Sequence, residues 1–140
     1  MIVADTDVWA RALLNDDAAQ AQRARRALAD ARSKGGVFLP LIVLAELSWV
    51  LRSRWAADRV LTTLESLLHT RGVTVEAADL AQKAIQAARA ANASFADHLI
   101  AQVGFASGAT QASPSTKNSR EPPKSASRNN PLPALPLADR

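Results

Sequence analysis

The sequence predicts an α/β domain in which a short parallel sheet is flanked by helices. Short apolar runs at residues 2–4, 37–39 and 73–75 alternate with longer segments of helical periodicity. That alternation is typical of a parallel sheet, because each crossover between parallel strands needs a helix-length connection. Hydrophobic residues make up 48% of the 140 residues, which is enough to bury the core of one domain.

The N-terminal half of the chain supplies two strands and three helices. We expect a buried strand at residues 2–4, a second strand at 37–39, and helices at 8–14, 16–32 and 41–54. Asp16 and Asp17 favour the start of the second helix, because negative charge stabilises a helix N-terminus. The glycine pair at 35–36 ends that helix, and Pro40 suits the first turn of the third.

The C-terminal half continues the same alternation. A helix at 58–68 closes near His69 and Gly72 and is followed by a third strand at 73–75. An alanine-rich helix is expected at 77–91, and a last helix runs to Phe105 with Ser94 as its N-cap.

Composition changes abruptly after Gly108. Six of the seven prolines lie beyond it, among Ser, Lys, Arg and Asn residues. We therefore predict one folded domain over residues 1–108 and a disordered tail over 109–140. Residues 1–108 hold 12 basic and 11 acidic side chains, whereas residues 109–140 hold 5 basic and 2 acidic ones. Most of the net charge of +4 therefore lies in the tail and says little about nucleic-acid binding by the domain.

The chain has no cysteine, so any metal must be held by carboxylates or by the two histidines. Oxygen ligands favour Mg²⁺ or Mn²⁺. The N-terminus has no basic leader, and no apolar run approaches the length of a membrane span. We therefore expect a cytoplasmic protein that does not contact membranes.

The first candidate site residue is Asp5, directly after the first strand. Ligands of open parallel sheets gather at the carboxyl ends of the strands, and a carboxylate there needs a positive partner. One of Asp5, Thr6 and Asp7 can serve as a helix N-cap, but one cap explains only one of them. We predict Asp5 as a metal ligand, with Thr6 or Asp7 as cap or support.

Glu46 is the second candidate, because it is the only charged side chain between residues 39 and 51. A glutamate on so apolar a helix reaches solvent at an edge, pairs with Arg52 or Arg54, or faces a cation. Asp97 is the third candidate. It also matches a capping box with Ser94, and by itself that explanation is the stronger one.

We assign no RNA-binding role to the tryptophans or to the arginine cluster. The tryptophans Trp9, Trp49 and Trp55 are expected in the core or in a partner groove rather than as base-stacking platforms. The arginines Arg23, Arg25 and Arg26 are expected on a solvated helix face, although arginine can contact RNA phosphate.

Three segments together resemble the PIN-domain family. They are Ile2-Val-Ala-Asp5-Thr6-Asp7-Val8, Pro40-Leu-Ile-Val-Leu-Ala-Glu46-Leu-Ser-Trp-Val-Leu51 and Ser94-Phe-Ala-Asp97-His-Leu-Ile100. Each motif is weak alone, but their order and spacing are fairly specific. The resemblance covers about the first hundred residues and is closest to VapC-type toxins of type II toxin–antitoxin systems.

The resemblance implies a three-layer, Rossmann-like fold whose acidic cleft binds one or two Mg²⁺ (or Mn²⁺) ions and hydrolyses phosphodiesters in RNA. Asp5 and Asp97 match the family's metal-binding aspartates, and Glu46 matches its third acid. Such toxins bind a small antitoxin whose tail blocks the acidic pocket, and they commonly form homodimers.

The chain departs from the family after Gly108-Ala-Thr110, where the family has an outer strand and a fourth acid in a Thr-Phe-Asp-like segment. Here residues 114–125 read P-S-T-K-N-S-R-E-P-P-K-S. The genetic code permits a nucleotide sequence that encodes these residues in one reading frame and T-F-D-K-K-L-A-R-A-A-E-V in the frame shifted by one base. We hypothesise a frameshift between Thr110 and Pro114 that removes the outer strand and the fourth acid. Asp139 offers no evident replacement.

Two alternative functions stay open. A degenerate toxin would bind an antitoxin through its apolar helices without cutting RNA. A haloacid-dehalogenase-like phosphatase would use Asp5-Thr6-Asp7 as the start of a D-x-D motif, but Trp9 stands where that motif needs Thr or Val.

Overall fold

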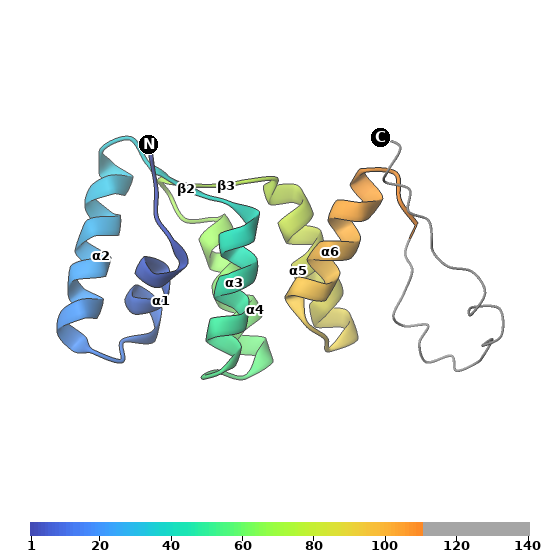
Figure 1. The fold of residues 1–140 in the computed structure, drawn as a ribbon, viewed down its shortest axis with the longest axis horizontal. Helices are drawn as coiled ribbons and strands as arrows, with labels where there is room; N and C mark the ends of the chain where they lie inside the picture. The colour runs from blue at the N-terminus through green and yellow to red at the C-terminus, as the bar shows by residue number, and fades with distance from the viewer. Residues whose placement is uncertain (111–140) are drawn as a thin grey trace, which may run out of the picture. The chain divides into compact units, whose positions relative to one another are not determined.

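The computed structural model describes residues 1–110, and it has the predicted α/β architecture (Figure 1). A three-stranded parallel sheet in the order β1-β2-β3 is built from Ile2–Val3, Val37–Leu39 and Val73–Val75. The helices are α1 (Thr6–Leu14), α2 (Ala18–Ser33), α3 (Leu41–Arg52), α4 (Ala57–Leu68), α5 (Ala78–Ala91) and α6 (Phe95–Ala106).

The helices associate in sequential pairs. Figure 1 shows α1 beside α2, α3 beside α4, and α5 beside α6, and these pairs pack against one another. Helix α3 also packs against both α1 and α6, so it is the central helix of the face that carries the candidate site residues.

The core lies between the sheet and the helices. Six large side chains have essentially no exposed surface: Leu39, Leu44, Leu47, Leu51, Leu64 and Ile85. Four of these leucines lie on β2 or α3, which explains why the segment at residues 39–51 is almost continuously apolar. Only five of the twelve residues of α3 are buried, however, and Ile42, Glu46 and Trp49 are exposed, so the apolar run encodes a helix with one buried face and not one buried on most of its faces.

The first strand differs from its prediction. Ile2 and Val3 are 50% and 61% exposed, whereas a buried strand was expected. The physical reason is position, because among residues 1–110 β1 pairs only with β2 and forms an edge of the sheet.

Gly72 is required by close packing in the turn before β3. Its φ is +83°, in the left-handed region, and an added Cβ would lie 2.8 Å from the Cβ of Arg32. The predicted disordered tail, the expected loss of the outer strand and the proposed frameshift all concern residues outside the described part of the chain. No helix within residues 1–110 is both long and apolar enough to span a membrane.

Candidate active site

Asp5 lies two residues after β1 and is the N-cap of α1. Its Oδ1 accepts a hydrogen bond from the backbone N–H of Val8 at 3.1 Å. The N-cap is therefore Asp5 itself, whereas the sequence analysis gave that role to Thr6 or Asp7. The side chain is exposed and pairs with no cation among the described residues. Because capping occupies one carboxylate oxygen, Oδ2 is left for another ligand.

Glu46 extends from α3 towards the N-terminus of α1. Its Oε1 accepts a hydrogen bond of 2.6 Å from the Thr6 hydroxyl, 40 residues away in sequence. Glu46 is exposed, which agrees with the solvent-edge alternative, and neither Arg52 nor Arg54 pairs with it. Arg54 instead binds Asp16 at 2.6 Å, and this contact raises the pKa of Arg54.

Asp97 lies in the first turn of α6, where Ser94 is the N-cap as predicted. The Ser94 hydroxyl accepts a hydrogen bond from the Asp97 backbone N–H at 3.4 Å. A full capping box also needs the Asp97 carboxylate to accept from the Ser94 backbone, and the described residues show no such bond. Capping therefore uses the backbone of Asp97 and leaves its exposed carboxylate unoccupied.

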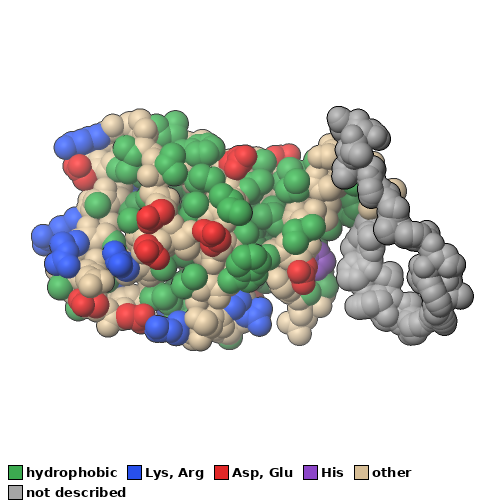
Figure 2. Space-filling view, in the orientation of Figure 1, with side chains coloured by type: hydrophobic (Ala, Val, Ile, Leu, Met, Phe, Trp, Pro, Cys, Tyr) green, Lys and Arg blue, Asp and Glu red, His purple; other side chains and the backbone are tan. Residues whose placement is uncertain are grey.

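The three acids stand on elements that adjoin one another. Helix α3, with Glu46, packs against α1, which Asp5 caps, and against α6, which carries Asp97. Figure 2 shows acidic side chains set among hydrophobic ones on the face over α1 and α3, while Lys and Arg side chains gather over α2. The described residues nevertheless contain no cluster of three or more His, Asp or Glu side chains close enough to hold one metal ion.

The chemistry of these acids and the elements that carry them suit a hard cation such as Mg²⁺. The spacing of the three side chains does not yet form a site for one. Asp5, Glu46 and Asp97 offer exposed carboxylate oxygens that have no basic partner among residues 1–110. One oxygen of Asp5 and one of Glu46 already accept hydrogen bonds. The structure brings Glu46 to the α1 N-terminus through Thr6. It does not gather all three carboxylates into one preformed site.

Glu76 is an acid at the same sheet edge that the sequence analysis did not select. It follows β3 directly, and its Oε1 accepts a hydrogen bond of 2.8 Å from the Leu41 backbone N–H at the start of α3. Pro40, the N-cap residue of α3, has no side-chain oxygen to offer, so Glu76 replaces the missing cap. Its place after a strand was a usable signal, the same one that identified Asp5.

The tryptophans divide by environment. Trp9 is buried in the core, as expected, with 4% of its surface exposed. Trp55 is half-buried beneath the Arg59 guanidinium, which lies 3.9 Å from the ring centroid. Trp49 is 59% exposed, so it is not a core residue.

Comparison with known families identifies the kind of domain. A family model described as PIN domain matches residues 2–113, which include every residue of the candidate site. No curated protein and no solved structure matched the chain in the corresponding comparisons.

Proposed function

Because the chain belongs to the PIN-domain family, whose members are generally metal-dependent nucleases, we propose that it is a Mg²⁺-dependent endoribonuclease toxin of the VapC type. The observation that carries the proposal is the placement of Asp5, Glu46 and Asp97 on α3 and on two elements that α3 contacts, with no ion pair to any of the three among residues 1–110. The match of residues 2–113 to the PIN-domain model supports a nuclease over a haloacid-dehalogenase-like phosphatase.

Each acid has a distinct role in this proposal. Asp5 and Asp97 bind Mg²⁺ (or Mn²⁺), and Glu46 is the third acid of the cleft, held towards Asp5 by the Thr6 hydroxyl. The bound cation supplies neutralisation of the scissile phosphate and activation of water. The cap bond of Asp5 holds its carboxylate through Oδ1, and the bond from the Asp97 N–H to Ser94 fixes the backbone of Asp97. Both bonds restrict where the remaining carboxylate oxygens can lie.

The proposed biological setting follows from the VapC-type assignment. RNA is the substrate, a small antitoxin covers the acidic face, and the toxin pairs as a homodimer in the cytoplasm. A small reading frame that overlaps the start of the gene upstream would support this setting, and an isolated gene would count against it.

The test of the site is Mg²⁺-dependent cleavage of structured and single-stranded RNA by the purified full chain. Asp5→Asn is a sharp variant, because the amide oxygen can still cap α1 while the negative charge of the metal ligand is lost. Glu46→Gln and Asp97→Asn complete the set, and Asp30→Asn, an exposed acid on α2, is the matched control. We expect the first three to lose cleavage and the control to keep it. Equal cleavage by all forms excludes the site.

A degenerate toxin that binds an antitoxin without cleaving RNA is the second candidate. It rests on the sequence after Thr110, which lacks the fourth acid of the family. The discriminating experiment compares the chain as it stands with one that carries the alternate-frame tail. Cleavage by the restored form alone supports the degenerate candidate, and cleavage by both supports the enzyme.

The DNA sequence of the gene tests the frameshift hypothesis independently of the cleavage assay. The alternate frame after the codon for Thr110 should be open and should encode an acidic Thr-Phe-Asp-like motif. An interrupted frame, or one without the acid, removes the hypothesis. Release of phosphate from small phosphoesters without any RNA cleavage would instead favour the phosphatase.

A further inference from the structure

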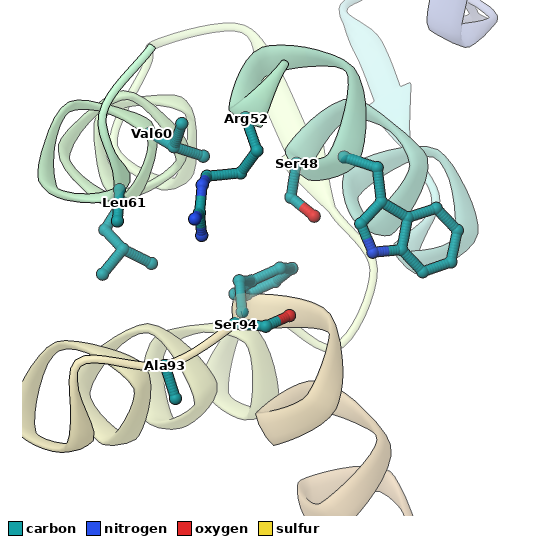
Figure 3. A pocket seen from close by; sticks show the side chains of 9 residues that line it. Ser48, Arg52, Val60, Leu61, Ala93 and Ser94 are labelled. Carbon is teal, nitrogen blue, oxygen red and sulfur yellow. The ribbon is translucent and has the colours of Figure 1, made fainter. Parts of the chain in front are cut away.

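A pocket of about 230 Å³ lies between α3, α4 and the start of α6 (Figure 3). It is smaller than the roughly 300–1,000 Å³ of pockets for drug-sized ligands, so it suits a single ring system. The side chains that matter for its chemistry come in pairs from the three segments: Trp49 and Arg52, Val60 and Leu61, and Ser94 and Phe95.

Arg52 gives the pocket a positive charge that no acidic side chain of residues 1–110 pairs with. Figure 3 shows its side chain projecting from α3 into the space between Val60 and Leu61 on one side and Ser48 on the other. Among the described residues Arg52 forms no ion pair and donates no side-chain hydrogen bond, whereas Arg54, two residues later, is bound to Asp16. A planar guanidinium with free donors is suited to bidentate binding of a phosphate.

The other surfaces of the pocket are apolar or aromatic. Val60 and Phe95 are almost completely buried, with 2% and 3% of their surfaces exposed, and form a fixed floor. Trp49 lines the same pocket but is 59% exposed, which places part of its ring at the mouth. The same pocket is thus lined by an exposed indole, which can stack on a base, and by an arginine without an ion pair in residues 1–110, which can bind a phosphate.

The pocket shares its framework with the candidate active site. Trp49 lies three residues after Glu46 on α3, so the two side chains are neighbours on the helix surface. Ser94 lines the pocket and also caps α6 through the Asp97 backbone N–H. The pocket and the acids therefore lie on the same two elements, α3 and the start of α6.

We propose that this pocket binds the nucleotide next to the scissile phosphate of the RNA substrate, with Arg52 on a backbone phosphate and Trp49 stacked on a base. The inference rests on the proposed nuclease function and adds a subsite to it. RNA fits these groups better than a protein helix does, because the free guanidinium needs an anion and the volume admits one ring rather than a row of side chains. Trp49, expected in a core or partner groove from the sequence, is thereby a stacking platform.

The experiment measures binding of a fluorescein-labelled single-stranded RNA 12-mer to the full chain by fluorescence anisotropy in EDTA, so that no cleavage occurs. Arg52→Ala should weaken binding about 10-fold, and the salt dependence of log K should become shallower by about 0.7, because the variant neutralises one phosphate fewer. Trp49→Ala should weaken binding about 10-fold, and Trp49→Phe should recover most of it, because phenylalanine retains a stacking face.

Arg23→Ala is the matched control, because it removes one exposed positive charge from α2, away from the pocket. It should leave both affinity and salt slope close to those of the unmodified chain. Equal effects of Arg52→Ala and Arg23→Ala, or a Trp49→Phe variant as weak as Trp49→Ala, would overturn the subsite.

The same measurements separate the subsite from the nuclease. If the unmodified chain cleaves RNA in Mg²⁺ and the pocket variants bind RNA normally, the subsite alone is wrong. If the unmodified chain neither binds nor cleaves RNA, the proposed substrate is wrong and the subsite fails with it. Circular dichroism of each variant checks folding, which we expect to be intact because Trp49 and Arg52 are both exposed.

Discussion

The Thr6 hydroxyl donates a 2.6 Å hydrogen bond to the Glu46 carboxylate and so joins the first turn of α1 to the middle of α3. The bond directs an exposed acid of the central helix towards the N-terminus that Asp5 caps. In the proposed active site Thr6 is therefore a positioning residue, since it would act through Glu46 rather than by binding a cation itself.

Replacement of Thr6 by valine keeps the shape of the side chain and removes the donor. We expect Mg²⁺-dependent cleavage to fall roughly 10-fold, because loss of a supporting hydrogen bond typically costs about 10- to 100-fold at metal sites and Glu46 would no longer be held in the cleft. The free energy of unfolding should change by less than about 1 kcal/mol, because this bond is exposed to solvent.

Thr6→Ser provides the control, because serine retains the hydroxyl. It should restore most of the cleavage and the Mg²⁺ dependence of the unmodified chain. A Thr6→Val protein that cleaves RNA as well as the unmodified chain would show that the hydrogen bond does not position Glu46 for catalysis.

The core of α3 offers a prediction on stability. Leu47 has no exposed surface, so Leu47→Ala should leave a cavity and lower the free energy of unfolding by about 2–5 kcal/mol. Ile42→Ala, on the same helix but at a position with 66% exposure, should change it by no more than about 0.5 kcal/mol. Urea titration of both variants measures the difference, and similar losses would mean that α3 is not buried on the side described.

Local sequence patterns predicted the elements well and the contacts between them poorly. The strands at 37–39 and 73–75 have the predicted bounds, and the helices begin and end within about two residues of expectation, because apolar periodicity and caps act locally. The exposure of Ile2 and Val3 was not predictable in this way, since a run of apolar residues does not reveal whether a strand lies at an edge.

The candidate site shows the same limit. Patterns selected Asp5, Glu46 and Asp97, but the Thr6–Glu46 and Leu41–Glu76 bonds join residues 40 and 35 positions apart and leave no periodic trace. The environment of Glu46 was left open between solvent, an arginine and a cation, because helical spacing gives the face of a residue and not what lies opposite. It is the packing of α3 against α1 that brings Thr6 opposite Glu46.

Glu76 carries a prediction about the start of α3. Glu76→Ala removes the oxygen that accepts from the Leu41 N–H, and the loss of an N-cap acceptor should cost about 1 kcal/mol. Glu76→Gln keeps an oxygen at that position and should lose less. Thermal or urea unfolding of the two variants tests the order, and equal stability of Glu76→Ala and the unmodified chain would show that the cap contributes nothing.

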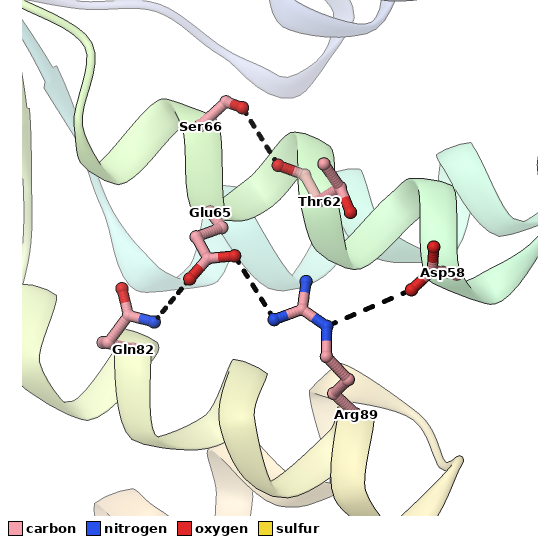
Figure 4. Close-up of polar contacts among 6 residues, drawn as sticks. All are labelled: Asp58, Thr62, Glu65, Ser66, Gln82 and Arg89. Carbon is pink, nitrogen blue, oxygen red and sulfur yellow. Dashed lines mark hydrogen bonds and ion pairs between the residues drawn. The ribbon is translucent and has the colours of Figure 1, made fainter.

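The contacts between α4 and α5 predict a dependence of stability on pH (Figure 4). Glu65 accepts hydrogen bonds from the Gln82 side-chain amide at 2.9 Å and from Arg89 at 3.3 Å. The Gln82 bond is the largest cause that lowers the pKa of Glu65, and Arg89 adds to it against the opposing effect of desolvation.

A carboxyl whose pKa is lower in the folded chain stabilises that state when it is ionised. The stabilisation is complete above the unfolded-state pKa, about 4.3, and is lost as the pH falls through the lower pKa of the folded state. The free energy of unfolding should therefore decrease more steeply below about pH 4.3 in the unmodified chain than in Glu65→Gln, which cannot ionise.

Urea titrations at a series of pH values between neutral and about pH 3 measure this difference. Gln82→Ala should flatten the acid limb as well, because it removes the largest cause of the lowered pKa of Glu65. Asp30→Asn is the comparison, because Asp30 pairs with Lys34 at 3.1 Å on a face where both side chains are more than half exposed, and such pairs contribute little. If Asp30→Asn flattened the acid limb as much as Glu65→Gln, the contacts with Gln82 and Arg89 would not be the source of the pH dependence.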